Sequence, residues 1–110
     1  MNAKNEFLSI VKGREVECAT ILYHRQGDEM FGIETIRNYY KLIEGYTLEE
    51  YEQFVNSLDF EYDSGYGCQE LFGMIWFKDG TWADRGEYDG SEWWSLKSRP
   101  EVPDVLKRSV

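Results

Sequence analysis

Two turn signals divide the last third of the chain into short strands, and they constrain the fold more than any other feature. Asp79-Gly80 and Asp89-Gly90 are residue pairs that favour two-residue hairpin turns. The segments beside them, Leu71–Phe77, Trp82–Tyr88 and Trp93–Lys97, are rich in aromatic residues, which favours strands. We therefore expect an antiparallel meander in this part of the chain.

The first turn also predicts a register. A two-residue turn sets Phe77 opposite Trp82 and Ile75 opposite Asp84. The strand Leu71–Phe77 is apolar on both of its faces, so we expect it to be central in the sheet and covered on both sides. The next strand is more mixed in composition and is expected nearer an edge.

The earlier part of the chain contains one well-marked helix. Thr47 and Glu50 have the spacing of a capping box, and Tyr46 and Tyr51 are placed to form a hydrophobic staple. The residues expected on the buried face of this helix are Leu48, Tyr51, Phe54, Val55 and Leu58. Further elements are expected as a helix over Asn5–Lys12 and a strand over Glu15–Tyr23. Met30–Ile43 matches both helix and strand patterns, and we favour strand.

These elements predict an α+β fold, with a twisted antiparallel sheet of four to five strands and one or two helices packed on one face. A chain of 110 residues is expected to form a single domain, 1–110, with an extended or loose tail from about residue 99. It has no apolar run of the ~20 residues that span a bilayer and no signal segment, which favours the cytoplasm. Cys18 and Cys68 are expected to be free thiols.

Charge is distributed unevenly along the sequence. Between Leu42 and Phe77 there are eight carboxylates and no Lys, Arg or His, and the whole chain carries a net charge of −9. This charge disfavours direct binding of nucleic acid or of anionic membranes, because both need positive charge on the protein. It favours a partner with a basic surface.

The segment Asp59–Asp63 alternates acidic and aromatic residues, which is the period of a strand. Asp59, Glu61 and Asp63 would then form a row of charges about 6.6 Å apart, comparable in scale to phosphates along an extended nucleic acid. With Glu49, Glu50 and Glu52 on the preceding helix, this row could imitate a nucleic-acid backbone. The alternative is an ordinary solvated surface.

Trp93 and Trp94 are adjacent on an expected strand, so one should enter the core while the other faces outward. An exposed Trp near acids such as Glu87 and Asp89 would bind Arg or Lys through cation–π contacts and ion pairing. Alternatively, the second Trp packs beneath the C-terminal tail, against Pro100 or Pro103.

The sequence gives less support to metal binding or catalysis. A carboxylate cluster around the second turn could bind a divalent metal ion; its members are Asp84, Glu87, Asp89 and Glu92. Solvated turn residues explain the same pattern.

His24 could pair with Cys18 or Cys68 in nucleophilic catalysis, but it is expected to be a surface residue. No phosphate-binding loop, zinc spacing or hydrolase motif is present, so we expect a protein without cofactor that is not an enzyme.

The runs Phe72–Trp82 and Glu87–Trp94 resemble small accessory proteins of phages and prophages. Some compact acidic members of that group are anti-CRISPR or anti-restriction inhibitors. The resemblance implies a non-catalytic protein that covers a nucleic-acid-binding or assembly surface of a host complex. It assigns no functional residue.

The sequence thus predicts an acidic binding protein that docks a basic surface of a nucleic-acid-handling complex. The partner-binding residues would be Asp59, Glu61, Asp63, Glu52, Trp93, Trp94, Glu87 and Asp89. Two alternatives stay open: a protein–protein interaction or dimerisation module, monomeric or homodimeric, and a carboxylate-dependent metal enzyme.

Overall fold

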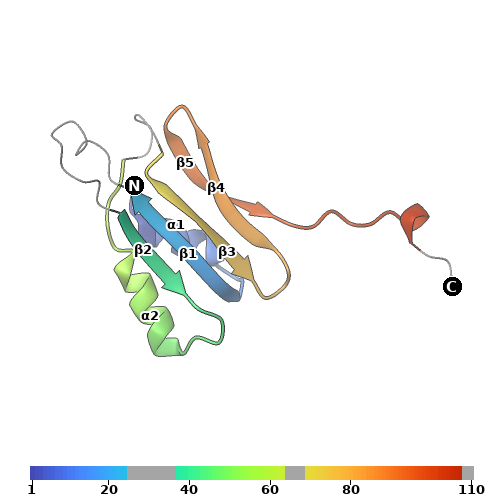
Figure 1. Ribbon diagram of the computed structural model, residues 1–110, viewed down its shortest axis with the longest axis horizontal. Coiled ribbons are helices and arrows are strands. Elements are labelled where there is room, and N and C mark those ends of the chain that lie inside the picture. Colours follow the sequence, from blue (N-terminus) through green and yellow to red (C-terminus); the bar gives the residue numbers. More distant parts are fainter. Residues whose placement is uncertain (25–36, 64–68, 108–110) are drawn as a thin grey trace.

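The computed structural model of the protein describes residues 1–24, 37–63 and 69–107. Its elements in chain order are α1 (Ala3–Val11), β1 (Val16–His24), β2 (Arg37–Leu42), α2 (Leu48–Ser57), β3 (Leu71–Phe77), β4 (Trp82–Tyr88), β5 (Ser91–Lys97) and the 3₁₀ turn η2 (Asp104–Leu106). The five strands form one antiparallel sheet in the order β2-β1-β3-β4-β5 (Figure 1). Both α-helices lie against one face of the sheet, which is the predicted α+β fold.

The capping box and the staple of α2 are confirmed. The Thr47 side chain accepts a hydrogen bond from the backbone N–H of Glu50, and the Glu50 carboxylate accepts one from the backbone N–H of Thr47, each at 3.1 Å. The rings of Tyr46 and Tyr51 stack with centroids 5.6 Å apart. The prediction that Leu48 is buried is wrong, since it is 74% exposed. The helix packs through its C-terminal half instead.

Strand is also the correct assignment for the end of the ambiguous segment, because Arg37–Leu42 forms β2. The first part of that segment, the expected polar loop beyond His24, and Cys68 lie outside the described residues. Asp89-Gly90 forms the expected two-residue turn, with Tyr88 paired to Ser91. Both turn residues have positive φ, 53° and 86°, as in a type I′ turn.

The first hairpin turn is one residue longer than predicted. Lys78–Gly80 form a three-residue loop: the N–H of Phe77 donates to the carbonyl of Thr81 at 3.0 Å, and Gly80 has φ 89°. The Asp79 carboxylate accepts from the backbone N–H of Thr81 at 2.9 Å and fixes this loop.

The extra loop residue shifts the register by one. Trp76 lies opposite Trp82, and Ile75 lies opposite Ala83. The predicted pairing of Phe77 with Trp82 is therefore wrong. Because successive strand residues point to opposite faces, the shift moves the partner of Trp82 from the buried face to the other face.

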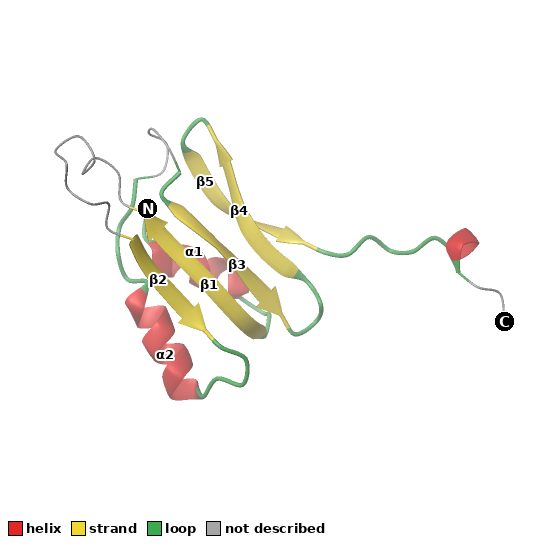
Figure 2. Cartoon of the chain, in the orientation of Figure 1, coloured by secondary structure: helices red, strands yellow, loops and turns green. Residues whose placement is uncertain are grey.

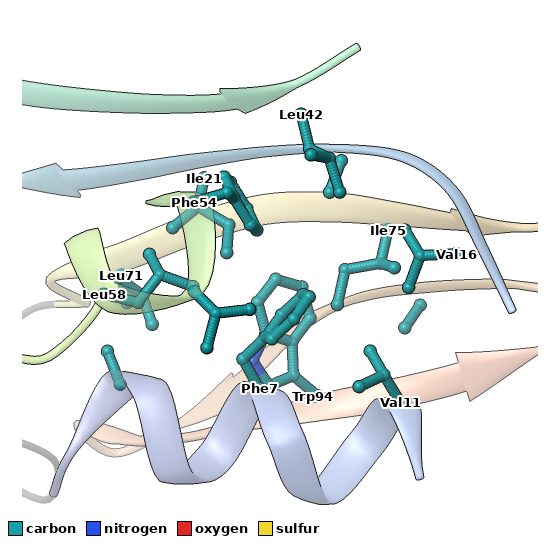
Figure 3. Packing of buried hydrophobic residues seen from close by; sticks show 14 of the residues in the cluster. Phe7, Val11, Val16, Ile21, Leu42, Phe54, Leu58, Leu71, Ile75 and Trp94 are labelled. Atoms are coloured by element: carbon teal, nitrogen blue, oxygen red, sulfur yellow. The ribbon is translucent and has the colours of Figure 1, made fainter. Parts of the chain in front are cut away.

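The core lies between the sheet and the two helices. Phe7 and Val11 of α1 point toward Ile75 and Trp94, while Phe54 and Leu58 of α2 point toward the other end of the sheet (Figure 3). The rings of Phe7 and Phe54 meet edge to face at 5.4 Å, which joins the two helices.

β3 is the third of five strands, so its central position is confirmed. It is not covered on both sides. Leu71 and Ile75 are at most 1% exposed, whereas Phe72 and Trp76, which alternate with them, are each 36% exposed. Both helices lie on the same face, which leaves the outward aromatic residues of β3 partly in water. At Gly73, a Cβ atom would lie 2.4 Å from the carbonyl oxygen of Thr20, so only glycine allows β1 to approach this closely.

Candidate interaction surface

The face of the sheet opposite the helices, called the open face below, is not covered by any described element (Figure 2). Alternation along each strand assigns its side chains. The residues on it include Tyr39, Lys41, Cys18, Thr20, Leu22, Phe72, Met74, Trp76, Trp82, Asp84, Tyr88, Trp93, Ser95 and Lys97. Aromatic and aliphatic side chains predominate in this set.

The register aligns these apolar side chains in rows across the strands. Trp76 of β3 has Cys18 of β1 on one side and Trp82 of β4 on the other. In a second row, Leu22 lies between Tyr39 of β2 and Phe72 of β3. Such cross-strand neighbours are within contact distance, so each row forms a continuous apolar strip.

Trp93 extends this apolar surface onto β5. It is 43% exposed and lies opposite Gly86 of β4. A Cβ atom on Gly86 would lie 2.5 Å from both Cε2 and Nε1 of Trp93, so the indole ring occupies the space where a side chain would be. The glycine therefore holds the indole flat against the sheet, with one ring face available to solvent.

Trp94 points the other way. It is 8% exposed and packs under α1 (Figure 3). The adjacent tryptophans are thus divided between core and surface, as the alternation predicted. The tail does not cover Trp93, because every tail residue from Ser98 to Lys107 is exposed.

Charged side chains also lie on the open face: Asp84 lies between Met74 and Ser95, and Lys41 lies opposite Thr20. The Lys97 ammonium lies 2.7 Å from the Asp84 carboxylate. Burial raises the pKa of the Cys18 thiol, and the negative charges of Glu44 and Glu17 raise it further. A raised pKa keeps this cysteine in the thiol form, which argues against the nucleophilic role considered from the sequence.

The acid row lies on the other side of the molecule, at the start of α1. Asp59 accepts a hydrogen bond from the Asn2 side chain at 3.1 Å, and Glu61 lies 3.1 Å from the amino group of Met1. Only an isolated bridge, Asn2 to Glu61, replaces the expected strand. The alternation itself is present, with Asp59, Glu61 and Asp63 exposed and Tyr62 4% exposed.

The other predicted binding residues differ in their distance from Trp93. Glu52 is exposed on α2, at the opposite side of the sheet order from β5. Glu87 and Asp89 are exposed at the β4–β5 turn, where the Glu87 carboxylate accepts from the backbone N–H of Gly90 at 2.8 Å. The structure therefore keeps Glu87 and Asp89 on the hairpin that carries Trp93, but it does not bring Glu52 or the acid row to it.

A buried ionic cluster lies beneath β4, and sequence reasoning missed it. The Arg85 side chain is 2% exposed and donates to Glu6 at 2.6 Å, to the Tyr62 hydroxyl at 2.9 Å and to Glu92 at 3.1 Å. Its guanidinium also lies 5.0 Å from the ring of Trp94. Burial lowers the pKa of Arg85, but hydrogen bonding and charge from Glu6 outweigh this and raise it overall.

Tyr62 and Glu92 complete this cluster. Burial and a hydrogen bond donated to Glu6 raise the pKa of Tyr62 far above the usual value of a phenol. The Glu92 carboxylate accepts from the backbone N–H groups of Glu70 at 2.8 Å and Leu71 at 3.0 Å. Arg85 is one of only two bases in residues 42–94. A base that is so rare among acids was the feature of the sequence that could have indicated a structural ion pair.

The carboxylates considered for a metal site do not converge. Asp84 is on the open face, whereas Glu92 faces the helices and binds Arg85. No group of three or more His, Cys, Asp or Glu suited to a metal ion occurs among the described residues. The expectation that Glu92 is a solvated turn residue is also wrong, since it is 4% exposed.

Comparison with protein-family models, curated proteins and solved structures finds no match for this chain. Among the described residues, no helix has the length and apolar composition to cross a bilayer. Functional inference therefore depends on the surface itself.

Proposed function

We propose that this protein is a non-enzymatic binding protein whose open face docks a basic surface of another protein in the cytoplasm. The observation that carries the proposal is the partial exposure of Phe72, Trp76 and Trp93 on a sheet whose other face is covered by both helices. Large aromatic side chains are the residues that most often anchor protein interfaces.

Charge selects the class of partner. A net charge of −9 repels phosphates and attracts basic protein surfaces, which speeds the encounter. Exposed indole rings also accept Arg and Lys side chains through cation–π contacts. A nucleic-acid-handling complex has a basic surface that normally faces phosphate, so an acidic protein docked there would act as an inhibitor.

The two surfaces have separate roles in this proposal. The acids on the helical side steer the approach at long range, and the aromatic residues of the open face hold the partner after contact. This differs from the expectation that the acid row itself is the docking surface.

The test is affinity capture from host-cell lysate at low and high salt with three variants. Trp76→Ser with Trp93→Ser removes two anchors and should abolish capture at both salt concentrations, since an anchor contributes about 2 kcal/mol or more. Glu49→Lys, Glu52→Lys and Asp63→Lys together change the net charge from −9 to −3 and should slow association only at low salt.

Leu48→Ser is the matched control, because Leu48 is 74% exposed but lies on α2, away from the open face. Heparin, a polyanion, should compete for the captured protein, because both would occupy its basic surface. Undiminished capture by the aromatic variant, or capture of an acidic protein that heparin does not release, would refute the proposal.

A further inference from the structure

The C-terminal tail leaves the body of the protein as an extended segment. Beyond β5 it projects along the longest dimension of the molecule, 65 Å, and ends in η2 (Figure 1). Pro103 has φ −61° and ψ 146°, the polyproline II conformation. A polyproline II helix has three residues per turn, so the spacing of Pro100 and Pro103 would place both on one edge of such a helix.

The tail carries exposed apolar side chains. Val105 is 88% exposed, Leu106 is 73% exposed and Val102 is 36% exposed. Within residues 1–24, 37–63 and 69–107, both the tail and the open face therefore present apolar surface.

These two surfaces are chemically complementary. Segments with prolines at this spacing bind surfaces lined by aromatic side chains, because the preformed polyproline II helix loses little entropy on docking. The open face offers Trp76, Trp82 and Trp93 from three neighbouring strands. Arg99, which precedes the first proline, would lie over an indole or pair with Asp84 of β4.

Charge favours the same pairing. Residues 98–110 contain three basic and two acidic residues, whereas the remaining chain contains nine bases and nineteen acids. The tail thus has a positive balance, as does the N-terminal segment 1–14, and it would approach the acidic body of another molecule.

We propose that the tail of a second copy, over Arg99–Leu106, docks on the open face. The tail leads away from its own sheet at the end of β5, where Lys97 is held by Asp84, so exchange between two molecules avoids a sharp chain reversal. In a dimer with two-fold symmetry, the tail of each copy would cover the open face of the other copy. Both the tails and the open faces would then be buried. The pairing rests on the same face as the proposed function, and an outside partner would have to displace the tail.

The experiment is sedimentation equilibrium of the purified full-length protein and of a form that ends at Ser98. The full-length protein should form a dimer at high micromolar concentration, and the truncated form should remain monomeric. Pro100→Ala with Pro103→Ala should weaken the dimer at least about tenfold, because it loosens the preformed helix. Glu101→Gln is the matched control in the tail and should not weaken it.

A second measurement does not depend on the variants folding normally. A synthetic peptide of residues 98–110 is titrated into isotope-labelled truncated protein, and the amide shifts should move on the open face and not on α1 or α2. A monomer at all concentrations, a dimer that survives truncation, or shifts confined to the helical side would each refute the proposal. None of those results would contradict the proposal that the open face binds a basic partner protein. Failed capture of a partner, in turn, would not contradict the proposed self-association.

Discussion

The helix-covered face and the open face of the sheet are made by the same five strands, yet they treat aromatic and charged side chains in opposite ways. On the covered face Trp94 is 8% exposed and the Arg85 side chain is 2% exposed, with several partners for its guanidinium. On the open face Trp93 is 43% exposed, and Lys97 has a half-exposed side chain paired to Asp84 alone among the described contacts.

The difference indicates a division of roles. Residues on the covered face contribute to folding stability, because burial there is nearly complete and each charge depends on its partners. Residues on the open face bury less surface within one molecule, and under the proposed function the rest is available to a partner. Four experiments test this comparison, from the largest expected effect to the smallest.

Arg85→Ala should have the largest effect on stability. It leaves the Glu6 and Glu92 carboxylates in a poorly hydrated site without their counter-charge, and loss of one member of a buried pair costs about 3–5 kcal/mol. Urea unfolding followed by circular dichroism measures the change. A loss below about 1 kcal/mol would show that this cluster behaves like a solvated one, and the comparison would fail.

Ile75 and Trp76 provide a matched pair, because they are adjacent on β3 and point to opposite faces. Ile75 is 0% exposed, so Ile75→Ala should cost about 2–5 kcal/mol. Trp76→Thr should cost only about 1 kcal/mol, although it removes the larger side chain. The same unfolding experiment ranks the two, and the reverse order would mean that the open face is part of the core.

Lys97→Ala tests the ion pair on the open face. The Lys97 side chain is 50% exposed and that of Asp84 is 30% exposed, so the loss should be within about 1 kcal/mol and should decrease with salt. The contrast with Arg85→Ala is the sharpest form of the comparison. A salt-independent loss of several kcal/mol would place Asp84 and Lys97 in a dry interface.

The smallest expected effect concerns Cys18 and is a shift in the pH dependence of its alkylation rate. Its raised pKa means that little thiolate is present at neutral pH, so alkylation in a Cys68→Ser background should be slower than for a free thiol. The rate should rise only above the usual thiol pKa of about 8.5. Glu44→Gln should move the profile toward lower pH, and a profile equal to that of glutathione would contradict the negative field at this end of the open face.

Local patterns in the sequence were sufficient for the elements with strong signals. The capping box of α2 depends on residues three positions apart, and the Asp89-Gly90 turn depends on its own backbone preference. The alternation at Trp93-Trp94 placed one ring inside and one outside but could not say which. That choice depends on the register of β4 and β5, which brings Gly86 beneath Trp93.

Features that depend on distant residues were not predicted. Asp79-Gly80 is compatible with turns of two or three residues, and the longer one determined which aromatic residues are neighbours. The apolar outward side of β3 indicated a second covering layer, although both helices pack on the other face. The contact between Arg85 and Glu6 joins residues 79 positions apart, so no local pattern could reveal it.

The Glu92 carboxylate has a consequence for motion within the fold. The ladder between β3 and β4 contains only Met74–Trp76 on the β3 side, and beyond it the N–H groups of Glu70 and Leu71 are held by this side chain from β5. Their amide hydrogens should therefore exchange with solvent whenever the β4–β5 hairpin swings away, without unfolding of the whole domain. These two amides would report a partial opening that the rest of β3 does not experience.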